Sequence, residues 1–392
     1  MKSFEKRIYL ASPTMHGDEM KYMTEAYETN WMSTVGENIN KVECVMADAL
    51  KQSSAVALAS GTSALHLALR LTGVKEGDYV CCSDLTFSAS ANPVLYEKAV
   101  PVFIDSERET WNMDPELLEK ALEQYPQTKA VIAVSLYGVP AQLDRIRKIC
   151  DSHGVCLIED AAEALGAIWK GEPAGSYGLI NCISFNGNKI ITGSSGGMLL
   201  SHDKDLCDKA RKWSTQSREN APWYQHEDLG FNYRMSNVVA GVVRGQIPYL
   251  TEHIERKKEI YTRYKEGFKE LPVRMNPFLP DAEPNYWLSC LTIDKYAMGY
   301  QKRTDLEAEY SHESGKSTPT EILETLLSLN AEGRPVWKPM HMQPIFQNYP
   351  FISSEDHVSE DLFERGLCLP SDIKMTEEEQ NRIIAVVKSC FK

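Results

Sequence analysis

AVALASGTSALHLALRLTG, residues 55–73, is the stretch that decides the fold. Its first five residues are all apolar, which is typical of a strand buried on both faces of a parallel sheet. SGTS follows as a glycine turn, and ALHLALRLTG then has the apolar spacing of an amphipathic helix. The stretch therefore predicts a strand, a tight turn and a helix, the repeating unit of an α/β domain.

Similar apolar runs continue along the next hundred residues. They are DYVCCS (78–83), AVPVFID (99–105), KAVIAVSLYG (129–138) and GVCLIED (154–160). Helical patterns lie between them, among them MDPELLEKALEQY at 113–125, where Asp114 suits an N-cap and Pro115 the first helical position. This alternation predicts a large α/β domain with a mostly parallel sheet.

The chain changes character after Arg234. Two helical patterns, at 235–250 and 253–271, lead to proline-rich turns and a strand pattern at 286–294. Further helices are expected near 318–330 and 375–391. We therefore divide the chain into a large domain with its N-terminal segment, residues 1–249, and a smaller α+β domain, residues 250–392.

Composition and charge exclude several classes of protein. The net charge of −13 argues against a general nucleic-acid binder or a binder of anionic membranes. No apolar run approaches the roughly 20 residues of a membrane span, and charges interrupt the N-terminus where a signal peptide would be apolar. The ten cysteines are scattered without a CxxC pair, so we expect reduced thiols, no metal site and a cytoplasmic protein.

The turn SGTS, residues 60–63, offers free backbone N–H groups at the start of a helix, an arrangement that suits a phosphate. Such turns are also common without any ligand. The chain contains neither G-x-G-x-x-G nor G-x-x-x-x-G-K-[ST], which argues against a dinucleotide site and a nucleoside triphosphate site.

Two further motifs carry charge at predicted strand ends or next to them. LIEDAAEALGA, residues 157–167, places Asp160 at the carboxyl edge of the sheet, where α/β proteins bind ligands. SFNGNKIITGSSGG, residues 184–197, holds Lys189 among small, amide and apolar residues. Asp160 could be a helix cap, and Lys189 could be exposed or ion-paired. A partly desolvated lysine could instead act as a nucleophile.

The three motifs together offer a partner to each of three groups of pyridoxal 5′-phosphate: a glycine turn for its phosphate, a carboxylate for its ring nitrogen and a lysine for its aldehyde. With ASGTSALHLAL, EDAAEALGA, SFNGNKIITGSSGG and GFNYRMSN, the chain resembles the DegT/DnrJ/EryC1/StrS family of pyridoxal-phosphate-dependent sugar aminotransferases. The resemblance runs from about Ser12 to Pro370. It implies the aspartate aminotransferase fold (fold type I), with the smaller C-terminal domain predicted above.

The resemblance also implies the residues that hold the cofactor. Lys189 would form the Schiff base and shuttle the proton, and Asp160 would keep the ring nitrogen protonated. The other positions implied at the cofactor are Gly61, Thr62 and Ser184 at the phosphate, Phe87 on the ring face, Glu163 near the ring hydroxyl, and Asn232. Asn232 would reach the cofactor of a neighbouring subunit, so the resemblance implies a homodimer with shared active sites.

Within the family, KWSTQSREN, YQHEDLGFNYRMSN and RPVWKPMH look most like the UDP-N-acetylbacillosamine transaminases. That likeness implies a UDP-linked 4-keto-6-deoxy-N-acetylhexosamine as acceptor and glutamate as amino donor, with 2-oxoglutarate released. The positions implied at the nucleotide sugar are Asn30, Trp31, Met32, Ser33, Arg234, Arg334, Trp337 and His341, with Arg218 and His226 as weaker candidates. The aromatics among them could be core residues, and the two arginines could be structural ion pairs.

Other functions stay open at this point. The acceptor could be a GDP-linked 4-keto-6-deoxymannose, or the amine could be delivered to C3. Sugar dehydration is disfavoured, because family members with that activity have histidine in place of the lysine. A nicotinamide-dependent oxidoreductase is disfavoured by the missing glycine fingerprint. A non-catalytic regulator with a pyridoxal domain is disfavoured by the net charge.

Overall fold

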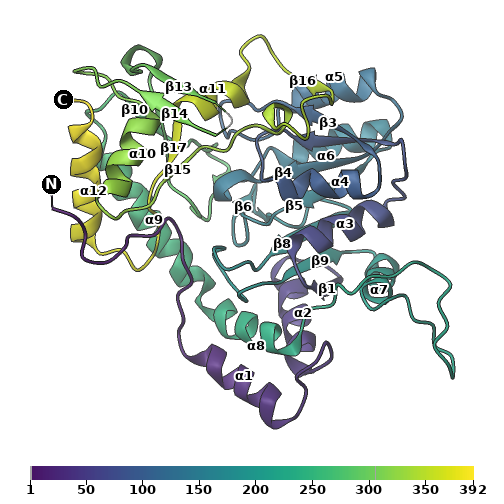
Figure 1. The fold of residues 1–392 in the computed structure, drawn as a ribbon. Helices are drawn as coiled ribbons and strands as arrows, with labels where there is room; N and C mark the ends of the chain where they lie inside the picture. The colour runs from purple at the N-terminus through teal and green to yellow at the C-terminus, as the bar shows by residue number, and fades with distance from the viewer. Residues whose placement is uncertain (1, 305) are drawn as a thin grey trace.

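An eight-stranded sheet forms the centre of the larger part of the molecule (Figure 1). The computed structural model describes residues 2–304 and 306–392. The order across the sheet is β1-β9-β8-β5-β4-β2-β3-β16. The strands are β1 (Ser54–Leu58), β9 (Gly197–Ser201), β8 (Ile180–Ser184), β5 (Cys156–Asp160), β4 (Thr128–Val134), β2 (Tyr79–Ser83), β3 (Val100–Ile104) and β16 (Phe351–Ile352).

All but one of these strands run in the same direction. The pairs β2–β3, β2–β4, β4–β5, β5–β8 and β3–β16 are parallel, whereas β9 is antiparallel to both β1 and β8. The carboxyl ends of the parallel strands therefore meet at one edge of the sheet, where α/β folds collect ligands. The mostly parallel sheet predicted from the apolar runs is confirmed.

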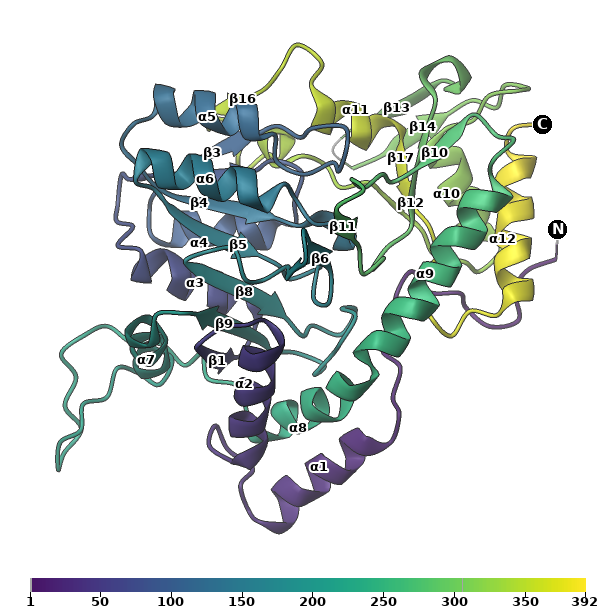
Figure 2. The ribbon, with the colours of Figure 1, turned by 180° about the vertical axis from the view of Figure 1, so that it is seen from behind.

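Helices cover both faces of the sheet (Figures 1 and 2). Alternate residues of β1 point to opposite faces of the sheet. Val56 and Leu58 pack with α3 and α7, whereas Ala55 and Ala57 pack on the other face with α2. The helices of this part are α1 (Asp18–Glu28), α2 (Glu37–Ala49), α3 (Gly61–Leu71), α4 (Asn92–Tyr96), α5 (Pro115–Gln124), α6 (Leu143–His153), α7 (Lys204–Trp213) and α8 (Asn237–Gln246). The predicted cap is present, because the Asp114 carboxylate accepts from the N–H groups of Glu116 and Leu117 at the start of α5.

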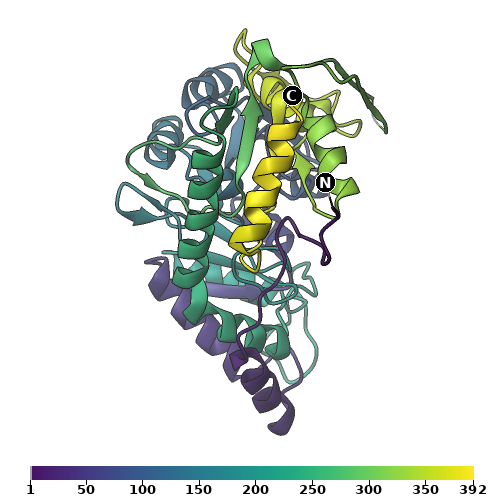
Figure 3. The ribbon, with the colours of Figure 1, turned by 90° about the vertical axis from the view of Figure 1, so that its left-hand side faces the viewer.

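A second, antiparallel sheet lies beside the large one, in the order β10-β12-β17-β15. Its strands are β10 (Val273–Met275), β12 (Cys290–Ile293), β17 (Gly366–Cys368) and β15 (Arg334–Pro335). The helices α9 (Leu250–Gly267), α10 (Pro319–Ser328), α11 (Val358–Arg365) and α12 (Glu377–Ser389) complete this part. Figure 3 shows α9 and α12 side by side. The helices expected near 318–330 and 375–391 are confirmed as α10 and α12.

The remaining elements are short. They are β6 (Ile168–Trp169), β7 (Glu172–Pro173) and β11 (Ala282–Glu283), the hairpin β13 (Gln301–Arg303) with β14 (Ala308–Tyr310), and single 3₁₀ turns at 88–90, 136–138, 247–249, 295–297 and 340–342. Among them β6 of the larger part pairs with β11 of the smaller part. Among the described residues, no helix is long and apolar enough to cross a membrane.

The division at residue 250 stays a prediction, and two contacts cross it. Phe4 and Ile8, from the N-terminal segment, pack in the core of the smaller part with Leu326 of α10. Residues 351–352, from the C-terminal third of the chain, add β16 to the edge of the large sheet. The N-terminal segment then runs past the sheet edge to α1, which packs against α8 (Figure 1).

A long loop between α7 and α8 projects away from the body of the molecule (Figures 1 and 2). We call residues 216–231 the arm. Trp223 and Tyr224 in the arm are 65% and 76% exposed. These two adjacent aromatic side chains place apolar area at the surface of the arm.

Candidate active site

A cavity of about 580 Å³ lies at the carboxyl edge of the large sheet. Residues that follow four parallel strands line it: Gly61 after β1, Phe87 after β2, Glu163 after β5 and Lys189 after β8. Trp287 and Trp337 close it from the smaller part of the molecule. Its size is in the range of pockets that take a cofactor or a small substrate.

One end of the cavity is formed by the first turn of α3. Ser60 is the N-cap, and its hydroxyl accepts from the N–H of Ser63, which leaves the N–H groups of Gly61 and Thr62 without a helical partner. A side chain at Gly61 would have its Cβ 3.1 Å from the Cβ of Ser184. A glycine here therefore lets the helix start approach the Ser184 hydroxyl, and together they form a cradle for an anion.

Asp160 lies deeper in the cavity and is only 4% exposed. One carboxylate oxygen accepts from the Ser90 hydroxyl at 2.7 Å and the other from the Ala162 N–H at 3.1 Å. Burial raises the pKa of this carboxyl, and the bond from Ser90 opposes that rise. A cation placed beside Asp160 would be stabilised by a carboxylate that its own hydrogen bonds hold in place.

Lys189 extends into the same cavity from the loop after β8. Its Nζ is 3.2 Å from Oε1 of Glu163 and 4.1 Å from the centre of the Trp287 ring. The side chain is 13% exposed, so the amine is largely withdrawn from solvent. Lys189 is therefore not an exposed surface lysine, and its ion pair with Glu163 lies inside the cavity.

Glu163 connects the lysine to one wall of the cavity. Its second oxygen accepts from the Tyr137 N–H at 2.7 Å, and the Tyr137 hydroxyl in turn accepts from the Trp337 N–H at 3.1 Å. Burial raises the pKa of Glu163, while Lys189 acts in the opposite direction. The Trp337 ring is 5.6 Å from that of Phe87, so these two aromatics form one continuous surface.

These groups fit pyridoxal 5′-phosphate by their chemistry. The α3 start with Ser184 offers donors to a phosphate, Asp160 offers a buried carboxylate to a protonated ring nitrogen, and Lys189 offers an amine. All of them line one cavity. Arg334 also lines the cavity and is the one arginine among its described lining residues. Its guanidinium could bind an anionic group of a substrate.

The remaining residues expected at the nucleotide sugar do not line this cavity in the single chain. Residues 30–33 form the exposed loop between α1 and α2, where Trp31 and Met32 lie at the surface. Arg234 forms an ion pair with Glu43 and donates to the carbonyl of Ala57 at 2.9 Å. In the single chain Arg234 thus makes the kind of ion pair that the sequence left open, and its role at the nucleotide sugar stays a prediction.

His341 and Asn232 also lie outside the cavity lining. His341 donates from Nδ1 to the buried carboxylate of Asp84 at 2.8 Å and stacks on Phe351. The neighbouring carboxylates of Asp84 and Glu360 raise its pKa, whereas burial lowers it. Asn232 is exposed beside the arm, so it remains accessible to another subunit. Arg218 and His226 lie opposite each other in an antiparallel backbone bridge across the arm.

Sequence reasoning missed several lining residues. Trp287 faces Lys189 and donates from its indole N–H to the Asn188 carbonyl at 2.8 Å. Leu10 and Ala11, from the N-terminal segment, form part of the same wall. No local pattern marks these positions, because distant packing brings them to the site. Ser90 could have been found, since it follows the end of β2 at the ligand-binding edge.

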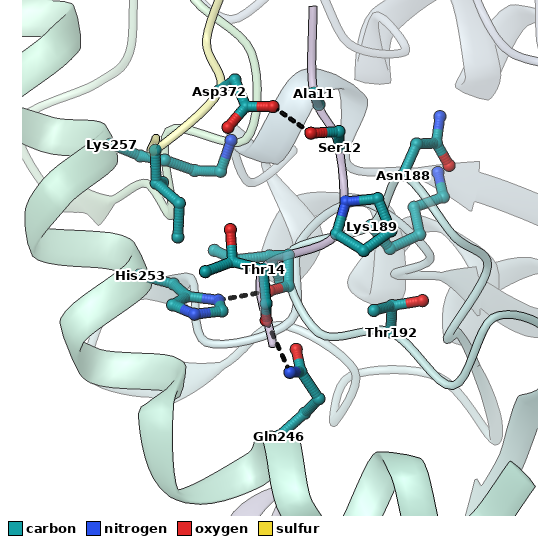
Figure 4. A pocket seen from close by; sticks show the side chains of 13 residues that line it. Ala11, Ser12, Thr14, Asn188, Lys189, Thr192, Gln246, His253, Lys257 and Asp372 are labelled. Atoms are coloured by element: carbon teal, nitrogen blue, oxygen red, sulfur yellow. Dashed lines mark hydrogen bonds between the residues drawn. The ribbon is translucent and has the colours of Figure 1, made fainter. Parts of the chain in front are cut away.

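A second, much smaller cavity of about 20 Å³ lies on the other side of the lysine loop (Figure 4). It has room for about one water molecule. Figure 4 shows the N-terminal segment passing between this loop and His253 and Lys257 of α9. The loop is thus contacted from both sides. The described residues contain no group of three or more side chains suited to a metal ion.

Comparisons with known proteins agree with this chemistry. Residues 13–388 match the DegT/DnrJ/EryC1/StrS aminotransferase family. EpsN of Bacillus subtilis (strain 168), provisionally named a pyridoxal phosphate-dependent aminotransferase, is 48% identical over 98% of this chain and 96% of its own length. A GDP-perosamine synthase of Caulobacter vibrioides is 35% identical over 97% of both chains.

Solved structures show the same fold. The pyridoxal phosphate form of Spr1654 from Streptococcus pneumoniae, provisionally named a sugar aminotransferase, superposes with a TM-score of 0.86, at 21% identity and 98% coverage of both chains. The aminotransferase TlmJ from Streptoalloteichus hindustanus gives a TM-score of 0.86 at 24% identity, again over 98% of both chains. At these identities the likeness concerns the fold, and the predicted fold type I architecture is confirmed.

Proposed function

The chain belongs to the DegT/DnrJ/EryC1/StrS aminotransferase family, and from this membership we propose a specific reaction for it. It is a pyridoxal phosphate-dependent sugar aminotransferase. In our proposal it transfers the amino group of glutamate to C4 of a UDP-linked 4-keto-6-deoxy-N-acetylhexosamine. The product would be a UDP-4-amino-4,6-dideoxy sugar for bacterial glycan biosynthesis, made by a cytoplasmic homodimer.

Pyridoxal phosphate supplies an electron sink that stabilises the negative charge left when a proton leaves the carbon bearing the amine. The chain supplies the groups that position it. The N–H groups of Gly61 and Thr62 and the Ser184 hydroxyl would bind the phosphate, and Asp160 would balance the positive ring nitrogen. Phe87 would cover one face of the ring.

Lys189 carries the central part of the proposal. Its amine lies within the cavity, 3.2 Å from a Glu163 oxygen, so it can hold a proton and pass it to a substrate carbon. Both halves of the reaction use the same amine: it removes a proton from glutamate and later delivers one to the sugar carbon. Donor and acceptor therefore take turns in one cavity, and ping-pong kinetics follow.

The choice of a UDP sugar is supported by sequence rather than by cavity shape. The runs KWSTQSREN and RPVWKPMH resemble the bacillosamine-type transaminases. Arg334 and Trp337, from the second run, line the cavity and can offer a cation and an aromatic face to a nucleotide sugar. The full-length similarity to a GDP-perosamine synthase favours a second candidate acceptor, GDP-4-keto-6-deoxymannose.

We further propose that the active unit is a homodimer with shared active sites. The arm projects from the body, and its exposed Trp223 and Tyr224 offer apolar area to a second chain. Asn232, at the base of the arm, is exposed and does not line the cavity of its own chain. A second subunit is the partner to which such a residue could contribute.

The proposal is tested by following the amine. The holoenzyme is incubated with ¹⁵N-glutamate and a UDP-4-keto-6-deoxy-N-acetylhexosamine, and the sugar product is examined by NMR. We expect one ¹⁵N at C4 for each 2-oxoglutarate formed. ¹⁵N at C3, or 2-oxoglutarate formed without any amino sugar, would contradict the proposed acceptor.

A further inference from the structure

Two histidines outside the cavity lie directly behind the lysine loop. His253, on α9, is 3% exposed, and its Nδ1 is 2.8 Å from the carbonyl oxygen of Ile190, the residue after Lys189. Its Nε2 is 2.8 Å from Nε2 of His16, in the N-terminal segment. His16 in turn stacks on Tyr249, with ring centres 3.7 Å apart.

The directions of these two hydrogen bonds follow from the carbonyl oxygen of Ile190. A carbonyl oxygen can only accept, so Nδ1 of His253 carries a hydrogen and donates to Ile190. In the neutral ring Nε2 is then an acceptor, and Nε2 of His16 must be the donor. The order is therefore His16 to His253 to the backbone of the lysine loop, and each ring can satisfy its neighbour only in this tautomer.

The segment that carries His16 also forms a wall of the active-site cavity. Leu10 and Ala11 line the cavity, and the Leu10 N–H donates to Glu332, itself a lining residue, at 3.0 Å. Further along, the Thr14 carbonyl accepts from Gln246 at 2.7 Å. Figure 4 shows Ala11, Ser12 and Thr14 in line between α9 and the lysine loop. One short segment thus contacts the cavity at one end and His253 at the other.

We propose that His253 is a positioning residue for Lys189 and that the His16–His253 pair couples the N-terminal segment to the lysine loop. A ligand that orders the segment over the cavity would thereby also fix the backbone at Ile190. The ligand part of this proposal rests on the proposed nucleotide-sugar substrate. The coupling itself is a property of the chain and can be measured without a substrate.

Three variants separate the two hydrogen bonds. His16→Phe keeps a ring on Tyr249 but removes the donor to His253. His253→Asn retains an N–H donor close to the position of Nδ1 and cannot reach His16. His253→Leu removes both contacts. His153→Phe, on the exposed end of α6, is the matched control for a histidine-to-phenylalanine change.

The readout is hydrogen–deuterium exchange of the holoenzyme in peptides that cover residues 8–17 and 184–193. We expect His16→Phe and His253→Leu to speed exchange in the lysine loop about fivefold, the loss expected for one net hydrogen bond. In His16→Phe no donor remains to hold His253 in the tautomer whose Nδ1–H donates to Ile190, whereas the amide of His253→Asn has no such requirement. His253→Asn should restore the loop to within about twofold of wild type while residues 8–17 exchange faster. With the cofactor bound, exchange in the lysine loop should stay faster than wild type in His16→Phe and His253→Leu, and it should match wild type in His253→Asn.

The proposal is overturned if His16→Phe leaves exchange in residues 184–193 at the wild-type rate, or if His253→Asn loosens the loop as His253→Leu does. If His253→Leu fails to fold, the other two variants still decide. With UDP-N-acetylglucosamine as a probe, wild type should gain protection in both segments and His16→Phe only in residues 8–17. If the probe protects neither segment in wild type, the proposed nucleotide-sugar site is contradicted. The exchange rates measured without the probe would still test the coupling through His16 and His253.

Discussion

At the scale of single residues, two buried carboxylates, Asp160 and Glu163, lie near one amine, Lys189. The buried carboxylates of Asp160 and Glu163 both face the cavity that contains Lys189. Burial raises the pKa of each carboxyl, and the Lys189 ammonium opposes that rise in both. A protonated ring nitrogen beside Asp160 would favour its charged form, which is a physical reason for this site to bind a cationic ring.

Among the residues of the site, Lys189 is the one whose replacement should lower activity most. We expect Lys189→Ala to lower transamination at least about 10³-fold, because one amine serves as nucleophile and as proton carrier. Borohydride should no longer fix the cofactor to the protein. Lys41→Ala, which removes an exposed lysine from an i,i+4 ion pair on α2, is the control and should keep full activity. Turnover by Lys189→Ala within about tenfold of wild type would show that this assignment is wrong.

At the scale of elements, the contact between β9 and the start of α3 shapes the phosphate cradle. A Cβ at Gly197 would lie 2.3 Å from the backbone of Ser60 and Gly61. We expect Gly197→Ala to weaken cofactor binding and to lower the free energy of unfolding by about 1–3 kcal/mol. Equilibrium dialysis and urea unfolding measure the two effects.

Gly187→Ala is the matched control, because its Cβ would meet only the Ser194 carbonyl oxygen, at 3.7 Å. It lies in the loop that carries Lys189, so it also tests whether any change near the site weakens binding. Equal losses in both variants would contradict the role given to the β9–α3 contact.

Helix α9 carries a buried ammonium whose titration should be measurable. Lys257 donates to the carbonyls of Trp287 and Ser371 at 2.8 and 2.9 Å, and burial lowers its pKa to about 8. Between about pH 8 and the ordinary lysine value near 10.5, the unfolded chain holds a proton that the folded chain has released. Unfolding therefore takes up a proton in this window, and stability rises with pH.

We expect the free energy of unfolding of wild type to increase relative to Lys257→Met as the pH rises from 8 to 10.5, by at most about 3 kcal/mol. Chemical unfolding at several pH values measures this difference. Lys258→Met, one residue along and exposed, should show no such trend. A difference between wild type and Lys257→Met that stays flat with pH would contradict a depressed pKa.

The elements that could be predicted from sequence are those with a strong local pattern. The apolar runs of β1 to β5 are buried on both faces of the sheet, and the capped helix α5 begins where Asp114 and Pro115 predict. The reversed direction of β9 and the two-residue strand β16 depend on distant pairing, which no local run shows. Trp287 and the N-terminal wall of the cavity were missed for the same reason.

The parts of the site that sequence predicted lie at strand ends. Asp160 ends β5, and Ser184 ends β8 with Lys189 in the loop that follows, so a parallel sheet necessarily brings them to one edge. The expected sugar residues in the loop 30–33 and near the arm have no such constraint. In our proposal they reach a site through a second subunit, and such a contact does not follow from local sequence.

At the scale of the whole molecule, the shared-site dimer predicts complementation. Neither Lys189→Ala nor Asn232→Ala alone should be fully active. Mixed and reassembled, half of the dimers would pair one of each, and one site of such a dimer would combine an intact lysine with an intact asparagine. We expect recovery of about a quarter of wild-type activity after mixing. Two variants that stay inactive together while forming mixed dimers would contradict shared sites.

The central claim, a UDP-linked 4-keto sugar as amino acceptor, is tested most directly by a single-turnover half-reaction. The enzyme is first loaded with the amine from glutamate and freed of donor. It is then mixed separately with UDP-4-keto-6-deoxy-N-acetylglucosamine and GDP-4-keto-6-deoxymannose, while the cofactor absorbance is followed. The account predicts that the UDP sugar restores the starting spectrum at least about tenfold faster. Faster recovery with the GDP sugar would contradict it.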